Sequence, residues 1–136
     1  MKKKTFVKKI KSDPDLMPEV EEFVMRHAAG CGFNDEQLNR LALSVAEAVS
    51  NSIVHGNKLD VNKNVTVVVF WDDEYFTVSF KDEGTGFNPQ NVPNPTFPEN
   101  ILKDHGRGIH IMKSFVDNVE YNFSDEGTEL ILKVKR

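Results

Sequence analysis

One apolar stripe in the first half of the chain constrains the fold more than any other sequence feature. Its members recur at helical spacing, at Leu38, Leu41, Ala42, Val45, Val49 and Ile53. Asn34 precedes the stripe and Gln37 follows three residues later, a variant of the capping box, and Gly56 and Asn57 end the pattern. The sequence therefore predicts one long amphipathic helix that packs its apolar side against a second layer.

Short β-branched and aromatic runs predict the strands of that second layer. Val65 to Trp71 with Tyr75 to Phe80 predict one hairpin, and Val119 to Phe123 with Thr128 to Val134 predict another. Thr5 to Ile10 is a candidate edge strand, because its lysines would deter stray pairing. These strands form a sheet against which the helix can pack.

Two further helices and a loop complete the predicted order. Pro18 suits a first helical position, and apolar residues recur from Val20 to His27 until Gly30 ends the pattern. Prolines and asparagines between Gly84 and Asp104 predict a loop, and Ile109 to Val116 a short helix. The order β, α, α, β, β, loop, α, β, β predicts an α+β two-layer sandwich, with helices on one face of a mixed, mainly antiparallel sheet.

Composition narrows the class of protein. The length of 136 residues suits one domain, residues 1–136, and the net charge of −4 argues against a nucleic-acid binder. One cysteine, Cys31, excludes an internal disulfide framework and a cysteine-based zinc site. The longest apolar run is too short to span a membrane, and the Lys-rich start lacks the apolar region of a secretory signal. We expect a cytoplasmic protein with no membrane segment.

Three polar residues lie one helical turn apart on the long helix. Glu47, Asn51 and His55 follow i, i+4 spacing, so they share a face opposite the apolar stripe. This is either a solvated polar face or a place where a carboxylate and an amide bind a hydrated divalent cation.

Two glycine-rich segments are candidate ligand sites. Asp82-Glu83-Gly84-Thr85-Gly86 follows a predicted strand, and is either a plain turn or a place where a carboxylate accepts a hydrogen bond from an exocyclic amine such as that of adenine. Gly106-Arg107-Gly108 opens the third predicted helix. It is either an ordinary helix start or a site whose N–H groups bind phosphate, although no Walker A motif occurs.

Taken together, these segments resemble one superfamily. Glu47 to Asn51 with His55 to Asn57, then Asp82 to Gly86, Gly106 to Ile109 and Gly127-Thr128 are similar in order and spacing to the asparagine box and three glycine boxes of the gyrase, heat-shock-chaperone, histidine-kinase and mismatch-repair ATPases. Within that superfamily the chain resembles the anti-sigma-factor serine/threonine kinases. The resemblance covers about Thr5 to Val134 and implies a Bergerat-type ATP-binding fold.

The resemblance also implies roles for individual residues. Glu47 would be the general base, Asn51 the Mg²⁺ ligand, and Asp82 the acceptor for the adenine amine, supported by Thr128. The remaining nucleotide-binding residues would be Gly84, Gly86, Gly106, Arg107, Gly108 and Ile109, with residues 87–105 acting as a lid. Some relatives carry an arginine just before the second glycine box, where this chain has Asp104-His105 and its basic residue is Arg107, inside the box.

The resemblance implies a protein that binds ATP or ADP with Mg²⁺, sequesters a sigma factor and phosphorylates a serine or threonine of an anti-anti-sigma antagonist of the STAS type. It also implies a homodimer that pairs through Thr5 to Ile10. Two alternatives remain at this stage: a non-kinase ATP-binding regulator of another partner, and an interaction domain with a dead pocket. Glu47 favours the kinase, because a module that only binds nucleotide needs no base.

Overall fold

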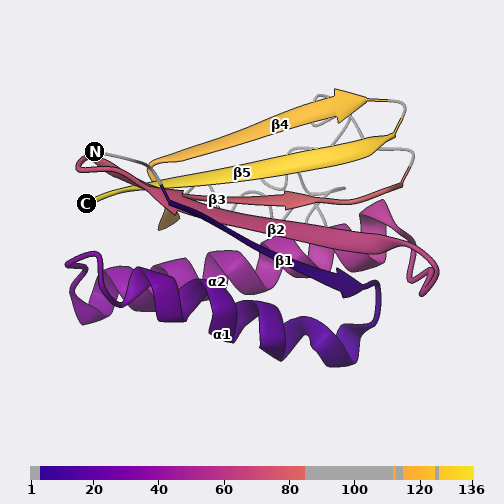
Figure 1. The fold of residues 1–136 in the computed structure, drawn as a ribbon, viewed down its shortest axis with the longest axis horizontal. Helices are drawn as coiled ribbons and strands as arrows, with labels where there is room; N and C mark the ends of the chain where they lie inside the picture. The colour runs from indigo at the N-terminus through magenta and orange to yellow at the C-terminus, as the bar shows by residue number, and fades with distance from the viewer. Residues whose placement is uncertain (1–3, 85–111, 113–114, 125) are drawn as a thin grey trace, which may run out of the picture.

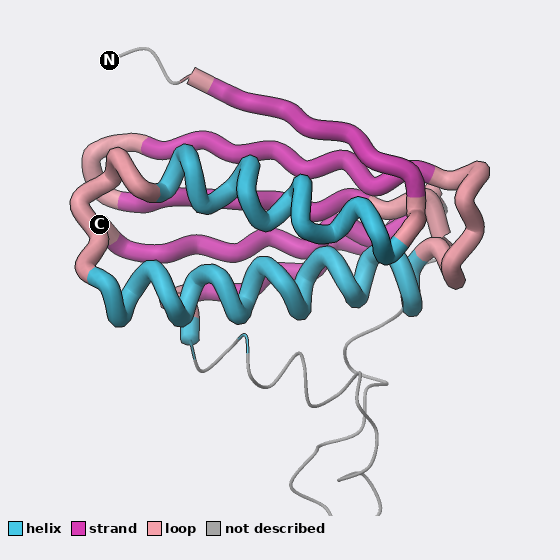
Figure 2. The backbone as a smooth tube through the Cα atoms, turned by 90° about the horizontal axis from the view of Figure 1, so that it is seen from below, coloured by secondary structure: helices cyan, strands magenta, loops and turns pink. Residues whose placement is uncertain are grey.

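The computed structural model describes residues 4–84, 112, 115–124 and 126–136. These residues form two layers, a five-stranded sheet and a pair of helices that run along one of its faces (Figure 1). Seen from below, the two helices lie side by side in front of the strands (Figure 2). The predicted two-layer sandwich is confirmed.

The elements follow the predicted order closely. The strands are β1 (Thr5–Lys11), β2 (Asn64–Trp71), β3 (Tyr75–Lys81), β4 (Asn118–Ser124) and β5 (Gly127–Lys135). The helices are α1 (Met17–Ala28), α2 (Asp35–Ser50), the short 3-10 turn η1 (Pro14–Leu16) and the π-helical turn η2 (Asn51–Gly56). Between β1 and α1 the chain forms the short turn η1.

The sheet has the strand order β1-β2-β3-β5-β4, and all four pairings among its described strands are antiparallel. Both predicted hairpins form, and β1 lies at the edge of the sheet as predicted. The two hairpins join at the centre of the sheet, where β3 pairs with β5. In this pairing Val78 lies opposite Leu132. This pairing brings the C-terminal end of β3 beside the start of β5, where the glycine-rich segments lie.

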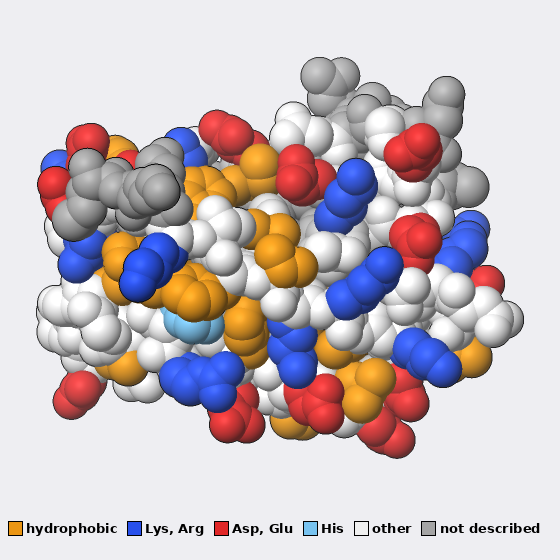
Figure 3. All heavy atoms as spheres, viewed as in Figure 1, with side chains coloured by type: hydrophobic (Ala, Val, Ile, Leu, Met, Phe, Trp, Pro, Cys, Tyr) orange, Lys and Arg blue, Asp and Glu red, His pale blue; other side chains and the backbone are white. Residues whose placement is uncertain are grey.

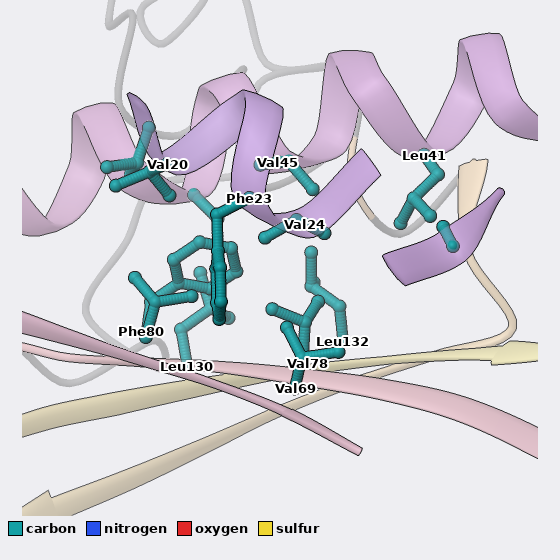
Figure 4. Packing of buried hydrophobic residues seen from close by; sticks show 14 of the residues in the cluster. Val20, Phe23, Val24, Leu41, Val45, Val69, Val78, Phe80, Leu130 and Leu132 are labelled. Carbon is teal, nitrogen blue, oxygen red and sulfur yellow. The ribbon is translucent and has the colours of Figure 1, made fainter. Parts of the chain in front are cut away.

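The core lies between the helices and the inner face of the sheet. The apolar stripes of α1 and α2 meet alternate residues of β2, β3 and β5 (Figure 4). Val24, Val45, Val78 and Leu132 are fully buried there. Full burial of one such side chain contributes about 1.5–3 kcal/mol, so the stripes recognised in the sequence stabilise the layered arrangement.

The predicted capping box begins α2. The side chain of Asn34 accepts the Gln37 N–H at 2.8 Å, and the side chain of Gln37 accepts the Asn34 N–H at 3.0 Å. These two bonds satisfy two N–H groups at the helix start that have no partner within the helix. The structure therefore confirms the start of the helix that the sequence predicted.

The end of the long helix differs from an ordinary α-helical end. From Asn51 to Gly56 the turn is a π-helix, and the N–H of Asn57 donates to the Ser52 carbonyl at 2.9 Å. Such wide turns are rare and occur frequently at functional sites. Apolar periodicity carries no signal for this change, because it records only which residues face the core.

The third predicted helix and the predicted lid lie almost wholly outside the described residues. Of the helix, Met112 is buried and helical, and the Val116 N–H donates to its carbonyl at 3.1 Å. Residues 85–111, which include the lid, are not among those described. No helix within the described part of the chain is long and apolar enough to cross a membrane.

Candidate functional site

Asp82 lies just beyond the end of β3, where it is held by main-chain groups. Its side chain is 3% exposed, and its Oδ1 atom accepts the N–H groups of Gly84 and Thr128, both at 3.1 Å. The Asp82 N–H in turn donates to the Thr128 carbonyl at 3.0 Å. Asp82 and Thr128, which the sequence analysis assigned to one contact, therefore lie side by side.

Burial dominates the electrostatics of this carboxyl group. Desolvation raises the pKa of Asp82 above its ordinary value, and the two backbone hydrogen bonds and the charge of Lys63 oppose that rise. A buried carboxylate gains more from an additional hydrogen-bond donor than an exposed one does. Asp82 is thus chemically suited to accept a hydrogen bond from a ligand N–H.

Three glycines allow the chain segments around Asp82 to pack closely. A Cβ atom on Gly56 would lie 2.1 Å from Asp82 Oδ2, and one on Gly127, whose φ is +142°, would lie 2.0 Å from the Asp82 carbonyl oxygen. A Cβ atom on Gly84 would lie 1.7 Å from the carbonyl oxygen of Gly56. No residue with a side chain fits at these three positions without moving the carboxylate or the backbone around it.

Glu47 and Asn51 lie at the C-terminal end of α2 and the start of η2. Asn51 is 5% exposed and its N–H donates to the carbonyls of both Glu47 and Ala48. Glu47 is half-buried and His55 is exposed. A fully solvated polar face, one of the two interpretations of this triplet, is wrong for Asn51. An amide oxygen is a ligand type that Mg²⁺ accepts, so Asn51 fits that group chemically.

Several predicted site residues lie outside the described part of the chain. They are Gly86, Gly106, Arg107, Gly108 and Ile109, and they include the Gly106 to Gly108 segment that is expected to bind phosphate. The structure describes Glu47, Asn51, Asp82, Gly84 and Thr128. Of these, it brings Asp82, Gly84 and Thr128 together directly, while Gly56 links the turn that begins at Asn51 to Asp82.

The sequence predicts no site role for Gly56, Asn57 or Ser12. Gly56 contacts the Asp82 carboxylate, and Asn57 is 1% exposed and accepts the N–H of Glu83 at 2.7 Å. In the sequence, Gly56 and Asn57 indicate only the end of a helix, although they belong to the segment that carries the resemblance. Ser12 offers no such signal, because its role depends on contacts with residues far away in the sequence.

The fold and the residues around Asp82 agree with a comparison against known protein families. Residues 10–134 match the model of the histidine kinase-like ATPase domain family, so the chain belongs to that family. Within the family the chain is similar to proteins named anti-sigma F factor, which agrees with the resemblance noted in the sequence.

Three such relatives show the extent of this similarity. The anti-sigma F factor of Clostridium perfringens is 32% identical over 105 residues, which cover 74% of each chain. That of Clostridium acetobutylicum is 33% identical over 74% of this chain and 71% of its own. That of a Geobacillus species is 35% identical over 72% of this chain and 69% of its own.

Two solved structures share the fold. The RsbU and RsbW domains of Rv1364c from Mycobacterium tuberculosis align with 98% of this chain at a TM-score of 0.70 and 15% identity, and this chain spans 33% of that one. The histidine kinase domain of a blue-light activated kinase from Erythrobacter litoralis aligns with 92% of this chain and 61% of its own, at a TM-score of 0.57 and 16% identity. Both confirm the Bergerat-type fold.

Proposed function

We propose that this chain is an ATP-binding anti-sigma factor with protein serine/threonine kinase activity. It sequesters a sigma factor and phosphorylates a serine or threonine of an anti-anti-sigma antagonist of the STAS type. The protein acts in the cytoplasm as a single domain, residues 1–136, and forms a homodimer. The observation that carries this proposal is the buried Asp82 carboxylate, held by Gly84 and Thr128, in a chain whose relatives are named anti-sigma F factor.

Asp82 is the proposed acceptor for the exocyclic amine of adenine. Its Oδ1 atom already accepts two backbone N–H groups, and a Cβ atom at position 56 would lie 2.1 Å from Oδ2, so only a glycine there leaves room for that oxygen. An aspartate in this environment accepts hydrogen bonds, whereas the guanine ring presents a carbonyl oxygen where adenine has its amine. The proposed site therefore favours adenine nucleotides over guanine nucleotides.

Asn51 is the proposed protein ligand of Mg²⁺, which neutralises phosphate charge when bound. Asn51→Ala should weaken ADP binding in the presence of Mg²⁺ and make the affinity nearly independent of the metal. Isothermal calorimetry with and without Mg²⁺ measures both effects. Asn39→Ala, an exposed substitution on α2, is the matched control. Equal affinity with and without Mg²⁺ in the parent protein would contradict the metal role of Asn51.

Glu47 is the proposed general base, which accepts the proton of the substrate hydroxyl during transfer. A base contributes about 10²- to 10⁴-fold to such a step. Glu47→Ala should therefore reduce transfer by at least about 100-fold. The same variant should keep nucleotide binding and ATP-dependent capture of the sigma factor, because neither needs a base.

The measurement is transfer of labelled phosphate from ATP to an antagonist encoded in the same genome. Glu36→Ala, an exposed carboxylate on the same helix, is the control. A Glu47→Ala rate within about threefold of the parent at saturating ATP would be too small an effect for a general base. That outcome would favour the alternative, a non-kinase ATP-binding regulator, for which the same pocket suffices.

A further inference from the structure

The Asn57 side chain joins three separate segments of the chain at the edge of the proposed nucleotide site. Its Nδ2 atom donates to Ser12 Oγ at 2.6 Å and to the Asn64 carbonyl at 3.0 Å. Its Oδ1 atom accepts the N–H of Glu83 at 2.7 Å. These partners lie just after β1, at the start of β2 and just after β3, so one buried amide fixes three strand ends.

The chemistry of the partners determines the orientation of this amide. The Glu83 N–H can only donate and the Asn64 carbonyl can only accept, so Oδ1 must face the former and Nδ2 the latter. Ser12 is fully buried, and its hydroxyl donates to the Lys63 carbonyl at 2.9 Å while accepting from Asn57. A carboxylate or an aliphatic side chain at position 57 cannot satisfy all of these groups.

Asn57 and the preceding Gly56 run alongside the segment that carries Asp82. Gly56 lies against the Asp82 carboxylate, and its carbonyl oxygen lies against Gly84. Asn57 then holds the backbone N–H of the residue between them, Glu83. Asp82, Glu83 and Gly84 are therefore each contacted by Gly56, the last residue of η2, or by Asn57, the residue that follows it.

The π-helical turn brings these two residues into position. The Asn57 N–H donates to the Ser52 carbonyl at 2.9 Å, five residues back, in place of the α-helical carbonyl four residues back. The chain then passes through Lys58 and Leu59, whose φ values are +53° and +62°. Non-glycine residues seldom adopt this conformation, which costs energy that neighbouring contacts such as those of Asn57 must offset.

We propose that Asn57, supported by Ser12, is a positioning residue that sets the specificity of the site for adenine by fixing the Asp82 to Gly84 segment against the end of η2. This inference rests on the proposed function, because it concerns how Asp82 recognises the adenine base. Asn57 itself contacts no nucleotide atom in this proposal. It acts through Glu83 and Gly56, and it holds the carboxylate where an exocyclic amine can reach it.

The test compares the affinities for ADP and for inosine diphosphate, in which a carbonyl oxygen replaces the exocyclic amine of adenine. The ratio of the two affinities does not change when part of the protein is unfolded, whereas each affinity alone does. The parent should bind ADP at least about tenfold more tightly, because IDP presents a carbonyl oxygen, an acceptor, where Asp82 is proposed to accept the amine of adenine. Calorimetry with Mg²⁺ present measures both ligands.

Asn57→Ala should bring the ratio to within about threefold of unity. The matched control is Asn62→Ala, an exposed amide in the same connection, which should keep the ratio of the parent. Ser12→Ala should lower the ratio at least twofold. If circular dichroism shows that Asn57→Ala does not fold, the ratio of Ser12→Ala tests the positioning role in its place. A parent ratio that persists in Asn57→Ala, or in Ser12→Ala when only that variant folds, would overturn the positioning role alone. A parent that binds ADP no better than IDP would overturn both this role and the proposed role of Asp82.

Discussion

Asp82 combines two properties that oppose each other in a folded protein. It is nearly fully buried, which disfavours its charge, and it is positioned to accept hydrogen bonds, which the proposed site requires. Burial raises the pKa of Asp82, so at neutral pH the ionised carboxylate reduces the stability of the empty protein. Binding sites commonly retain such groups at a cost in stability.

This conflict predicts how stability should depend on pH. The folded state holds the Asp82 proton more tightly than the unfolded state does, so the stability due to protonation is present below pH 3.8, the ordinary value for Asp, and is lost as the pH rises through the raised pKa. Asp82→Asn keeps an oxygen for the two backbone N–H groups and carries no charge. The variant should therefore unfold at a higher urea concentration than the parent at pH 7.

Urea unfolding from pH 7 down to pH 4 provides the measurement for Asp82→Asn. The advantage of the variant should shrink as the pH falls, and the same variant should bind ADP more weakly at pH 7. Asp73→Asn, in the exposed turn between β2 and β3, should behave as the parent throughout. An Asp82→Asn protein that is less stable than the parent at pH 7 would show that the carboxylate stabilises the fold.

His27 is a titratable residue that packs as an aromatic ring in the apolar stripe of α1. It continues the apolar stripe of α1, and its ring stacks on Phe6 of β1 with centroids 4.2 Å apart, near Trp71 of β2. Burial, and secondarily the charge of Arg26, lower the pKa of His27. The neutral imidazole therefore packs as an aromatic ring between the helix and the edge of the sheet, which explains its place in the stripe.

At the scale of elements, the site is a junction of main-chain segments. The end of η2, the end of β3 and the start of β5 approach so closely that Gly56, Gly84 and Gly127 have no room for a Cβ atom. The contact between Gly84 and Gly56 is between backbone atoms, which cannot move aside as a flexible side chain can. A substitution at this contact must therefore shift one of the two elements.

Gly84→Ala should destabilise the protein by about 1–3 kcal/mol, the usual cost of overpacking, and weaken ADP binding at least tenfold. Gly30→Ala is the matched control, because a Cβ atom at Gly30 would meet nothing within 4 Å. Chemical denaturation and calorimetry on both variants separate the two effects. If Gly84→Ala binds ADP as tightly as Gly30→Ala does, the close approach of η2 and β3 is not needed for the site.

At the scale of the whole molecule, the two described helices cover one face of the sheet and leave β1 at its edge (Figures 1 and 2). On the face seen in Figure 3, Lys and Arg side chains are interspersed with Asp and Glu around a patch of apolar side chains. Val7, in the middle of β1, is 61% exposed. The edge strand thus offers both backbone groups and an apolar side chain to a partner.

The proposed homodimer pairs through this edge strand. Light scattering at high micromolar concentration should give twice the mass of the chain, and Val7→Glu should give the mass of the monomer. Val61→Glu, at a position 53% exposed in the loop before β2, should remain dimeric. A parent protein that is monomeric under these conditions would contradict the proposed homodimer and leave the kinase proposal unaffected.

The secondary-structure elements and the family could be predicted from local patterns in the sequence. Apolar periodicity reports which face of an element is buried, so it located α1, α2 and both hairpins, and the Asn34 and Gln37 pair marked the start of α2. The residue types of Glu47, Asn51 and Asp82, with their glycines, carried the resemblance. These signals are local, since each depends on residues a few positions apart.

The assembly of the site, in contrast, depends on contacts between residues far apart in the sequence. The π-helical turn, the burial of Asn51 and the bonds from Asn57 to Ser12 and Glu83 join residues up to 45 positions apart. No periodicity records such contacts, because they depend on where the sheet brings the ends of β1, β2 and β3. Asp82 was recognisable from its neighbours in the sequence. Gly56, Gly84 and Gly127, which pack closely around it, and the side chain of Asn57, which binds the next residue, come together only when the two layers pack.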